Sequence, residues 1–221
     1  MAVRVKIEGI TSLADARAAI RYGADALGLV FAKSPRQVDI KKARRIVASL
    51  EPFVQTVGLF VNPSIEELIA IGNAVGFDIL QLHGSETPLW INRYLDVPFL
   101  KAFRPRRSGF AASLHRFRAA LERPQQLRGL VLDAYDPALA GGTGKTLPWK
   151  WISRARDAGR LKGLPPLILA GGLTPDNVAE AVRIARPAAV DVASGVESRP
   201  GKKDYAKLRD FIAAAKAALS S

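Results

Sequence analysis

At 221 residues, 48% of them hydrophobic, the chain is long enough for one large domain with a substantial core. It contains no cysteine, which excludes disulfides, thiolate metal sites and cysteine nucleophiles, and its two histidines leave little basis for a metal centre. A formal net charge of +13 favours anionic partners, among them nucleic acid, membrane surfaces and phosphorylated metabolites.

The first residues, MAVRVK, and the lengths of the apolar runs bear on where the protein works. The start lacks the apolar core of a signal peptide, and no apolar run approaches the roughly eighteen residues of a membrane span. We therefore expect a cytoplasmic protein without a membrane partner. The basic residues are dispersed rather than interleaved with stacking aromatic side chains, which favours a solvated basic face over a nucleic-acid partner.

Short apolar runs rich in β-branched residues recur along the whole chain. Their near-continuous apolarity is typical of parallel strands that are covered on both faces. There are eight of them, at residues 3–7, 26–30, 55–61, 78–82, 98–103, 129–133, 166–170 and 188–194.

An amphipathic stretch with a plausible cap follows each of these runs. The first would begin at Thr11 or Ser12 and end at Gly23. The others cover residues 39–50, 62–76, 87–95, 109–122, 147–159, 174–185 and 204–219. Eight strand–helix units predict a single-domain (β/α)₈ TIM barrel that spans residues 1–221. Periodicity does not show closure, so a doubly wound open sheet is the alternative.

Chargeable side chains stand where the predicted strands end, on the face whose loops carry the chemistry of such barrels. Glu8 follows the first strand and Asp133 ends the sixth, so their carboxyl groups would lie on different sides of the rim. On either side of a sugar phosphate the two could act as acid and base, the less solvated group keeping its proton to higher pH. The alternatives are a surface carboxylate for Glu8 and an Asx turn for Asp133.

Two glycine-rich turns follow the seventh and eighth predicted strands. They contain Gly171 and Gly172 in one and Ser194 and Gly195 in the other. Backbone N–H groups in such turns bind anions, and these two loops are the usual phosphate site of a barrel. The alternative is that they are plain turn glycines.

The stretch GGTGKT at residues 141–146 resembles a nucleotide-binding loop only superficially. The Walker spacing requires glycine where Leu139 stands, so we reject that interpretation. Gly141, Gly142 and Gly144 instead predict a mobile lid over the active face, which would exclude water during catalysis.

Two further side chains are candidate substrate contacts. Arg36, after the turn residues Ser34 and Pro35, offers a fork of donors suited to a substrate carboxylate, unless it is an ordinary loop arginine. His83 follows an alternating strand and is either a ligand contact or a buried structural histidine. His115 lies inside a predicted helix, and we expect no role for it.

Taken together, these stretches resemble the phosphoribosylanthranilate isomerase family of tryptophan biosynthesis. The motifs that carry the resemblance are VKIEGIT, GADALGLVFAKSPRQV, LQLHGSE, VLDAYDPALAGGTGKT, LILAGGLTPDNVAEAV and VDVASGVESRPGKKD, in that order. The resemblance implies an aldose–ketose (Amadori) isomerase that needs neither metal nor organic cofactor. It implies that Asp133 is the general acid, that Arg36 orients the anthranilate, that Asp191 contacts the substrate and that the glycine turns hold its phosphate. We expect a monomer or a homodimer.

The sequence departs from the family pattern at the position of the catalytic base. Family members have cysteine in the motif KICGIT, where this chain has Glu8. The intrinsic pKa values of cysteine and glutamate are about 8.5 and 4.3. A carboxylate base nevertheless has precedent, because the related histidine-pathway isomerase uses an aspartate at the corresponding strand end. We therefore expect Glu8 to replace the cysteine as the base; the alternatives are impaired activity, retained binding alone, or a related phosphoribosyl aminoaldose as substrate.

Overall fold

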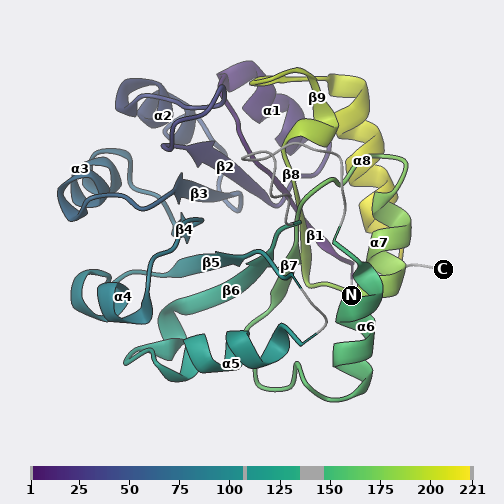
Figure 1. Ribbon diagram of the computed structural model, residues 1–221. Helices are drawn as coiled ribbons and strands as arrows, with labels where there is room; N and C mark the ends of the chain where they lie inside the picture. The colour runs from purple at the N-terminus through teal and green to yellow at the C-terminus, as the bar shows by residue number, and fades with distance from the viewer. Residues whose placement is uncertain (1, 107–108, 135–146, 220–221) are drawn as a thin grey trace.

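The computed structural model describes residues 2–106, 109–134 and 147–219 of the chain. Eight parallel strands form a closed barrel in the order β1 to β8, and Figure 1 shows the helices arranged around it. The strands are β1 (Arg4–Ile7), β2 (Ala26–Val30), β3 (Gln55–Phe60), β4 (Ile79–Leu82), β5 (Phe99–Phe103), β6 (Leu127–Leu132), β7 (Leu167–Leu169) and β8 (Ala189–Val192). The predicted (β/α)₈ barrel is confirmed.

Closure depends on the pairing of the first and last strands. Residues Arg4 to Ile7 of β1 pair in parallel with residues Ala189 to Val192 of β8. An open doubly wound sheet has two unpaired edge strands, so this pairing excludes the alternative fold.

Each predicted amphipathic stretch contains an observed helix. The helices are α1 (Leu13–Arg21), α2 (Ile40–Val47), α3 (Ile65–Val75), α4 (Pro88–Tyr94), α5 (Ala111–Ala119), α6 (Trp149–Asp157), α7 (Val178–Ala185) and α8 (Tyr205–Ala217). Of the two candidate caps for α1, Ser12 is the one whose side chain accepts from a first-turn amide, that of Asp15. Gly23, one residue beyond the C-cap, has a φ of 98°, as a terminating glycine should.

Several elements were not predicted. β9 (Glu197–Arg199) and β10 (Lys202–Lys203) form a small antiparallel hairpin after β8. Two short 3₁₀ helices, η1 (Pro124–Gln126) and η2 (Ser194–Val196), also occur. The turn predicted at Ser194 and Gly195 is therefore the beginning of η2. No helix within the described ranges is long and apolar enough to cross a membrane.

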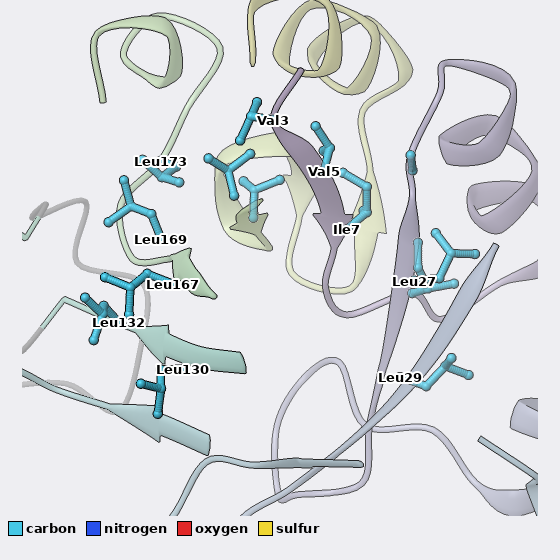
Figure 2. Close-up of a cluster of buried hydrophobic side chains, with 14 of the residues drawn as sticks. Val3, Val5, Ile7, Leu27, Leu29, Leu130, Leu132, Leu167, Leu169 and Leu173 are labelled. Atoms are coloured by element: carbon cyan, nitrogen blue, oxygen red, sulfur yellow. The ribbon is translucent and has the colours of Figure 1, made fainter. Parts of the chain in front are cut away.

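Alternation along the strands separates a hydrophobic layer from the barrel interior. Side chains such as Val5, Ile7, Leu130 and Leu132 are buried in the main hydrophobic cluster, between the strands and the surrounding helices (Figure 2). Because successive strand residues point to opposite faces, the positions between them face the interior. In β1 this position is Lys6, which is 4% exposed. The same alternation carries Glu8 to the rim of the barrel.

Candidate active site

One cavity of about 150 Å³ opens at the carboxyl ends of β1, β6, β7 and β8. It brings together the described residues that the sequence singled out for a site, namely Glu8, Arg36, His83, Asp133, Gly171, Gly172, Asp191, Ser194 and Gly195. The predicted lid residues Gly141, Gly142 and Gly144 lie outside the described residues. His115 lies in α5 on the outside of the barrel and is not part of the lining.

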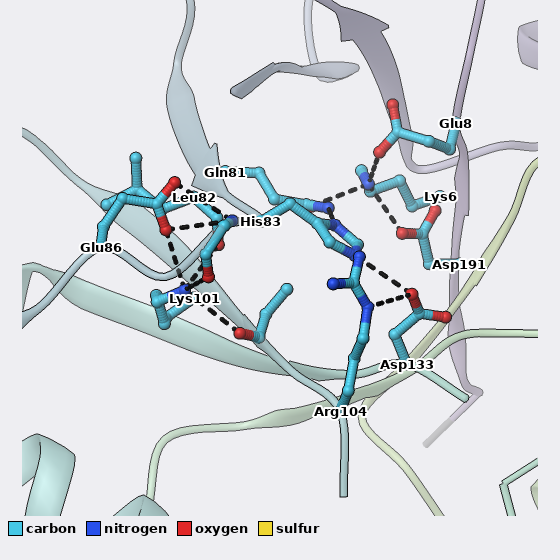
Figure 3. A network of polar contacts seen from close by, with 12 residues as sticks. Lys6, Glu8, Gln81, Leu82, His83, Glu86, Lys101, Arg104, Asp133 and Asp191 are labelled. Atoms are coloured by element: carbon cyan, nitrogen blue, oxygen red, sulfur yellow. Dashed lines mark hydrogen bonds and ion pairs between the residues drawn. The ribbon is translucent and has the colours of Figure 1, made fainter. Parts of the chain in front are cut away.

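The Glu8 side chain points into this site and is only 9% exposed (Figure 3). Its Oε2 accepts a hydrogen bond from the ammonium of Lys6, and its Oε1 lies 3.1 Å from the amide of Gly9. Gly28 in β2 makes room for it, because a Cβ there would lie 2.1 Å from Oε1 of Glu8. The carboxylate of Glu8 therefore lies at the cavity without facing bulk water.

Asp191 shares the ammonium of Lys6 with Glu8. Its Oδ2 lies 2.9 Å from Nζ of Lys6, and its buried Oδ1 has no hydrogen-bond partner among the described residues. Burial raises the pKa of Asp191 to about 6, with Lys6 opposing the rise and the charge of Glu8 adding to it. Burial lowers the pKa of Lys6, but Asp191 and Glu8 outweigh burial and raise it above its ordinary value. Lys6 is therefore a fixed cation.

Asp133, on the other side of the site, has different neighbours. Its Oδ2 lies 3.1 Å from Nε2 of His83 and 3.7 Å from Nε of Arg104. Burial raises the pKa of Asp133, but the hydrogen bond to His83, the charge of Arg104 and the hydrogen bond from the backbone amide of Ala134 bring it below its ordinary value. Gly171 lets the chain after β7 approach this carboxyl group, since a Cβ there would lie 2.7 Å from Oδ1 of Asp133.

The two predicted anion turns pack directly against each other. Gly171 and Gly172 have φ values of 83° and 67°, a region that favours glycine. A Cβ at Gly195 would lie 1.8 Å from the carbonyl oxygen of Leu173, so a side chain there has no room. Asn177 orders the first turn by donating to the carbonyl of Gly172 at 3.0 Å. The turns therefore form one continuous main-chain wall of the cavity.

Arg36 already holds a carboxylate in this structure. Its Nε and one terminal nitrogen lie 2.8 and 2.7 Å from the two carboxylate oxygens of Glu197. Lys203 also pairs with Glu197 at 3.0 Å and donates to the main-chain carbonyl of Glu8. Arg36 lines the cavity, and its other terminal nitrogen makes none of these bonds, so it can offer further donors to a ligand.

Sequence reasoning missed several side chains that build the site. Lys6 and Gln81 are inward-facing members of predicted strands, and their position between apolar neighbours was an available signal. Arg104, Glu197 and Lys203 carry no comparable signal, because only the tertiary fold brings them to the rim. Within the part of the chain that the structure describes, no group of three or more histidine or acidic side chains is placed to hold a metal ion.

Comparison with known proteins decides the family. The model of the N-(5'-phosphoribosyl)anthranilate (PRA) isomerase family matches residues 5–214. The chain belongs to this family. A PRA isomerase of Trichlorobacter lovleyi is 47% identical over 218 residues, covering 98% of this chain and 100% of the relative. A PRA isomerase of Pseudomonas fluorescens is 48% identical, covering 96% of this chain and 97% of the relative.

Solved PRA isomerases have the same architecture. The enzyme of Thermotoga maritima superposes with a TM-score of 0.84 at 39% identity, covering 97% of this chain and 98% of that chain. A PRA isomerase in complex with reduced 1-(o-carboxyphenylamino)-1-deoxyribulose 5-phosphate gives a TM-score of 0.80 at 37% identity, with the same coverage. The similarity therefore extends over the barrel that positions the cavity.

Proposed function

We propose that the chain catalyses the Amadori rearrangement of N-(5'-phosphoribosyl)anthranilate to 1-(2-carboxyphenylamino)-1-deoxyribulose 5-phosphate, a step of tryptophan biosynthesis. The observation that carries this proposal is the single cavity in which Glu8 and Asp133, from different strands, accompany two tightly packed anion turns. Its family membership supports the same reaction.

The phosphate would bind to the main-chain amides around Gly171, Gly172, Ser194 and Gly195, as anions do at such turns. This anchor leaves the ribose between the two carboxyl groups. Asp191 lines the same cavity, and its buried Oδ1, which has no hydrogen-bond partner among the described residues, would accept from a sugar hydroxyl.

The reaction requires one acid and one base. Asp133 protonates the ring oxygen, the C1–O bond breaks, and the nitrogen lone pair forms the C1=N bond of a protonated Schiff base. Glu8 then removes the proton from C2, and the electrons of the C–H bond neutralise the nitrogen to give an enolamine. Loss of the hydroxyl proton at C2 and protonation at C1 complete the ketone. No atom is gained or lost overall.

The acid role requires a change in Asp133 when substrate binds, because the pKa of its free carboxyl group lies below the ordinary value. A bound substrate excludes water from a side chain that is 22% exposed, and it brings the negative charges of phosphate and anthranilate. Both effects favour the protonated carboxyl group. The donor in the reacting complex is thus prepared by the substrate itself.

Glu8 stands in the family's cysteine position and, in this proposal, replaces it as the base. The longer side chain is accommodated over Gly28, which leaves its carboxylate on the cavity wall. Arg36, held by Glu197, would direct its remaining donors to the anthranilate carboxylate.

We further propose that the protein works in the cytoplasm, as a monomer or a homodimer, on this small molecule alone. One similar solved structure is of monomers of the dimeric phosphoribosylanthranilate isomerase from Thermotoga maritima, which supports both oligomeric states. Sedimentation at several protein concentrations would distinguish them.

The direct test is turnover. Purified protein is expected to convert freshly prepared phosphoribosylanthranilate, with loss of anthranilate fluorescence and formation of the ketose phosphate. The phosphoribosyl aminoaldose of histidine biosynthesis serves as the control substrate and is expected to remain unconverted. Absence of turnover, combined with micromolar binding of the reduced product analogue, would show a sugar-phosphate-binding barrel and overturn the isomerase proposal.

A further inference from the structure

A chain of buried and partly buried polar contacts joins the two proposed catalytic carboxylates (Figure 3). From Glu8 it passes to Nζ of Lys6, and from there to Oε1 of Gln81 at 2.9 Å. Nε2 of Gln81 lies 3.1 Å from Nδ1 of His83, whose Nε2 lies 3.1 Å from Oδ2 of Asp133. Gln81 is fully buried, so no solvent competes for its amide.

The chemistry of Lys6 fixes the direction of this chain. An ammonium group has three donors and no acceptor, so the atom of Gln81 that faces Lys6 must be its oxygen. The amide nitrogen, a donor only, then faces Nδ1 of His83. Nδ1 must accept, and in a neutral imidazole the other nitrogen carries the hydrogen. Nε2 of His83 therefore donates to Asp133.

Protonating Nδ1 of His83 would place two donors face to face. Rotating the amide of Gln81 would relieve that contact, but it would turn the NH₂ group toward the ammonium of Lys6. Two carboxylates, Glu8 and Asp191, hold that ammonium charged. The hydrogen bond from Lys6 thus fixes the orientation of the Gln81 amide.

The other charged groups near His83 come from four different strands of the barrel. Asp133 and Arg104 stand at the ends of β6 and β5, while Lys6 and Asp191 belong to β1 and β8. The pair formed by Glu86 and Lys101 lies at a second cavity that His83 also lines. Gln81 occupies Nδ1, the nitrogen of His83 that would accept a second proton.

We propose that Gln81 is a positioning residue that holds His83 in its neutral Nε2–H form, so that Asp133 meets a hydrogen-bond donor and not a cation. An imidazolium would form a full ion pair with the Asp133 carboxylate and hinder its conversion to the acid. The neutral donor orients the same carboxyl group without that charge. The catalytic consequence rests on the proposed function, whereas the tautomer does not.

The tautomer can be measured directly by ¹⁵N NMR. The chain has only two histidines, and His115 lies on the outer face of α5, so His115→Gln leaves His83 as the one imidazole signal. At pH 7 we expect Nδ1 of His83 without a hydrogen and Nε2 with one. Finding an Nδ1–H tautomer, or an imidazolium, would overturn the proposal.

Two substitutions then test the role of Gln81. Gln81→Glu has the same shape but presents a carboxylate to Nδ1, so we expect a doubly protonated His83, a kcat lowered at least about tenfold and a nearly unchanged KM. The limb of the kcat–pH profile that reports Asp133 should move to lower pH. Gln81→Met removes both polar contacts and should leave a mixture of tautomers.

The outcomes separate this proposal from the proposed function. A folded Gln81→Glu protein with parental kcat and pH profile would contradict the positioning role. Should both Gln81 variants fail to fold, the tautomer of the His115→Gln protein still decides the matter. Absence of turnover by the parent protein would instead remove the isomerase function and leave the tautomer measurement standing.

Discussion

The base side and the acid side of the cavity are built differently. Glu8 is 9% exposed and shares the ammonium of Lys6 inside the barrel, whereas Asp133 is 22% exposed and faces His83 and Arg104 at the rim. Lys6, the partner of Glu8, lies in β1 two residues earlier and does not depend on loops. The surroundings of the acid include the 49% exposed side chain of Arg104, which a substrate can rearrange. In the proposed mechanism this difference assigns opposite tasks to two carboxyl groups on one rim.

The largest effect is expected on the base side. Glu8→Gln keeps the size of the side chain and a hydrogen-bond acceptor for Lys6 but cannot remove a proton from carbon. We expect kcat to fall by about 10⁴-fold, at the upper end for acid–base residues, with an unchanged thermal unfolding curve. The matched variant Glu8→Cys, which introduces the base expected from the family resemblance, should show measurable turnover. Full activity in Glu8→Gln would remove Glu8 from the mechanism.

The acid side should be nearly as sensitive. Asp133→Asn can still accept from His83 but has no acidic proton, so we expect kcat to fall by about 10³-fold. Asp96→Asn provides the control, since that carboxyl group is 76% exposed and lies outside the cavity. Robust turnover by Asp133→Asn, measured with the same fluorescence assay, would contradict the acid assignment.

Gly28 offers a test of how closely the base side is fitted. A Cβ added at this position would displace the carboxylate of Glu8. Because a misplacement near 1 Å costs about 10²-fold in rate, Gly28→Ala should lower kcat by about that factor. Cysteine at position 8 is shorter, and we therefore expect a much smaller loss when Gly28→Ala is combined with Glu8→Cys. Equal losses in the two backgrounds would mean that Gly28 acts independently of the base.

A smaller effect is expected from the titration of Asp191, whose pKa is raised to about 6. Because Oδ2 is bound to Lys6, the added proton would go to Oδ1 and convert the acceptor proposed for a sugar hydroxyl into a donor. We expect kcat/KM to decline by about tenfold as the pH falls through 6, which is the loss of one hydrogen bond.

Asp191→Asn should imitate the protonated form. Its amide oxygen would face Lys6 and its NH₂ group the cavity, so the variant should show the low activity of the parent at every pH between about 5 and 7. A variant that keeps the parental limb near pH 6 would show that another group titrates there.

The two sides also differ in how far sequence predicts them. Apolar runs, caps and glycines predicted eight strand–helix units, although not the closure of the sheet. A carboxyl group at each of two strand ends was enough to name Glu8 and Asp133 as candidates. The side chains that contact these two carboxyl groups were harder to predict. Alternation shows that Lys6 and Gln81 point inward, but it does not show which inward side chains meet at the barrel axis. The pairing of Arg36 with Glu197 could not be foreseen, since the hairpin that contains Glu197 consists of polar and charged residues without an apolar pattern.

The most direct test of the account is a crystal structure of this chain with the reduced product analogue bound. The account predicts the phosphate on the amides near Gly172 and Gly195, C2 of the sugar within about 3.5 Å of a Glu8 carboxylate oxygen, and the Asp133 carboxyl group at the opposite side of the sugar. A phosphate bound elsewhere on the rim, or a C2 atom out of reach of Glu8, would contradict it.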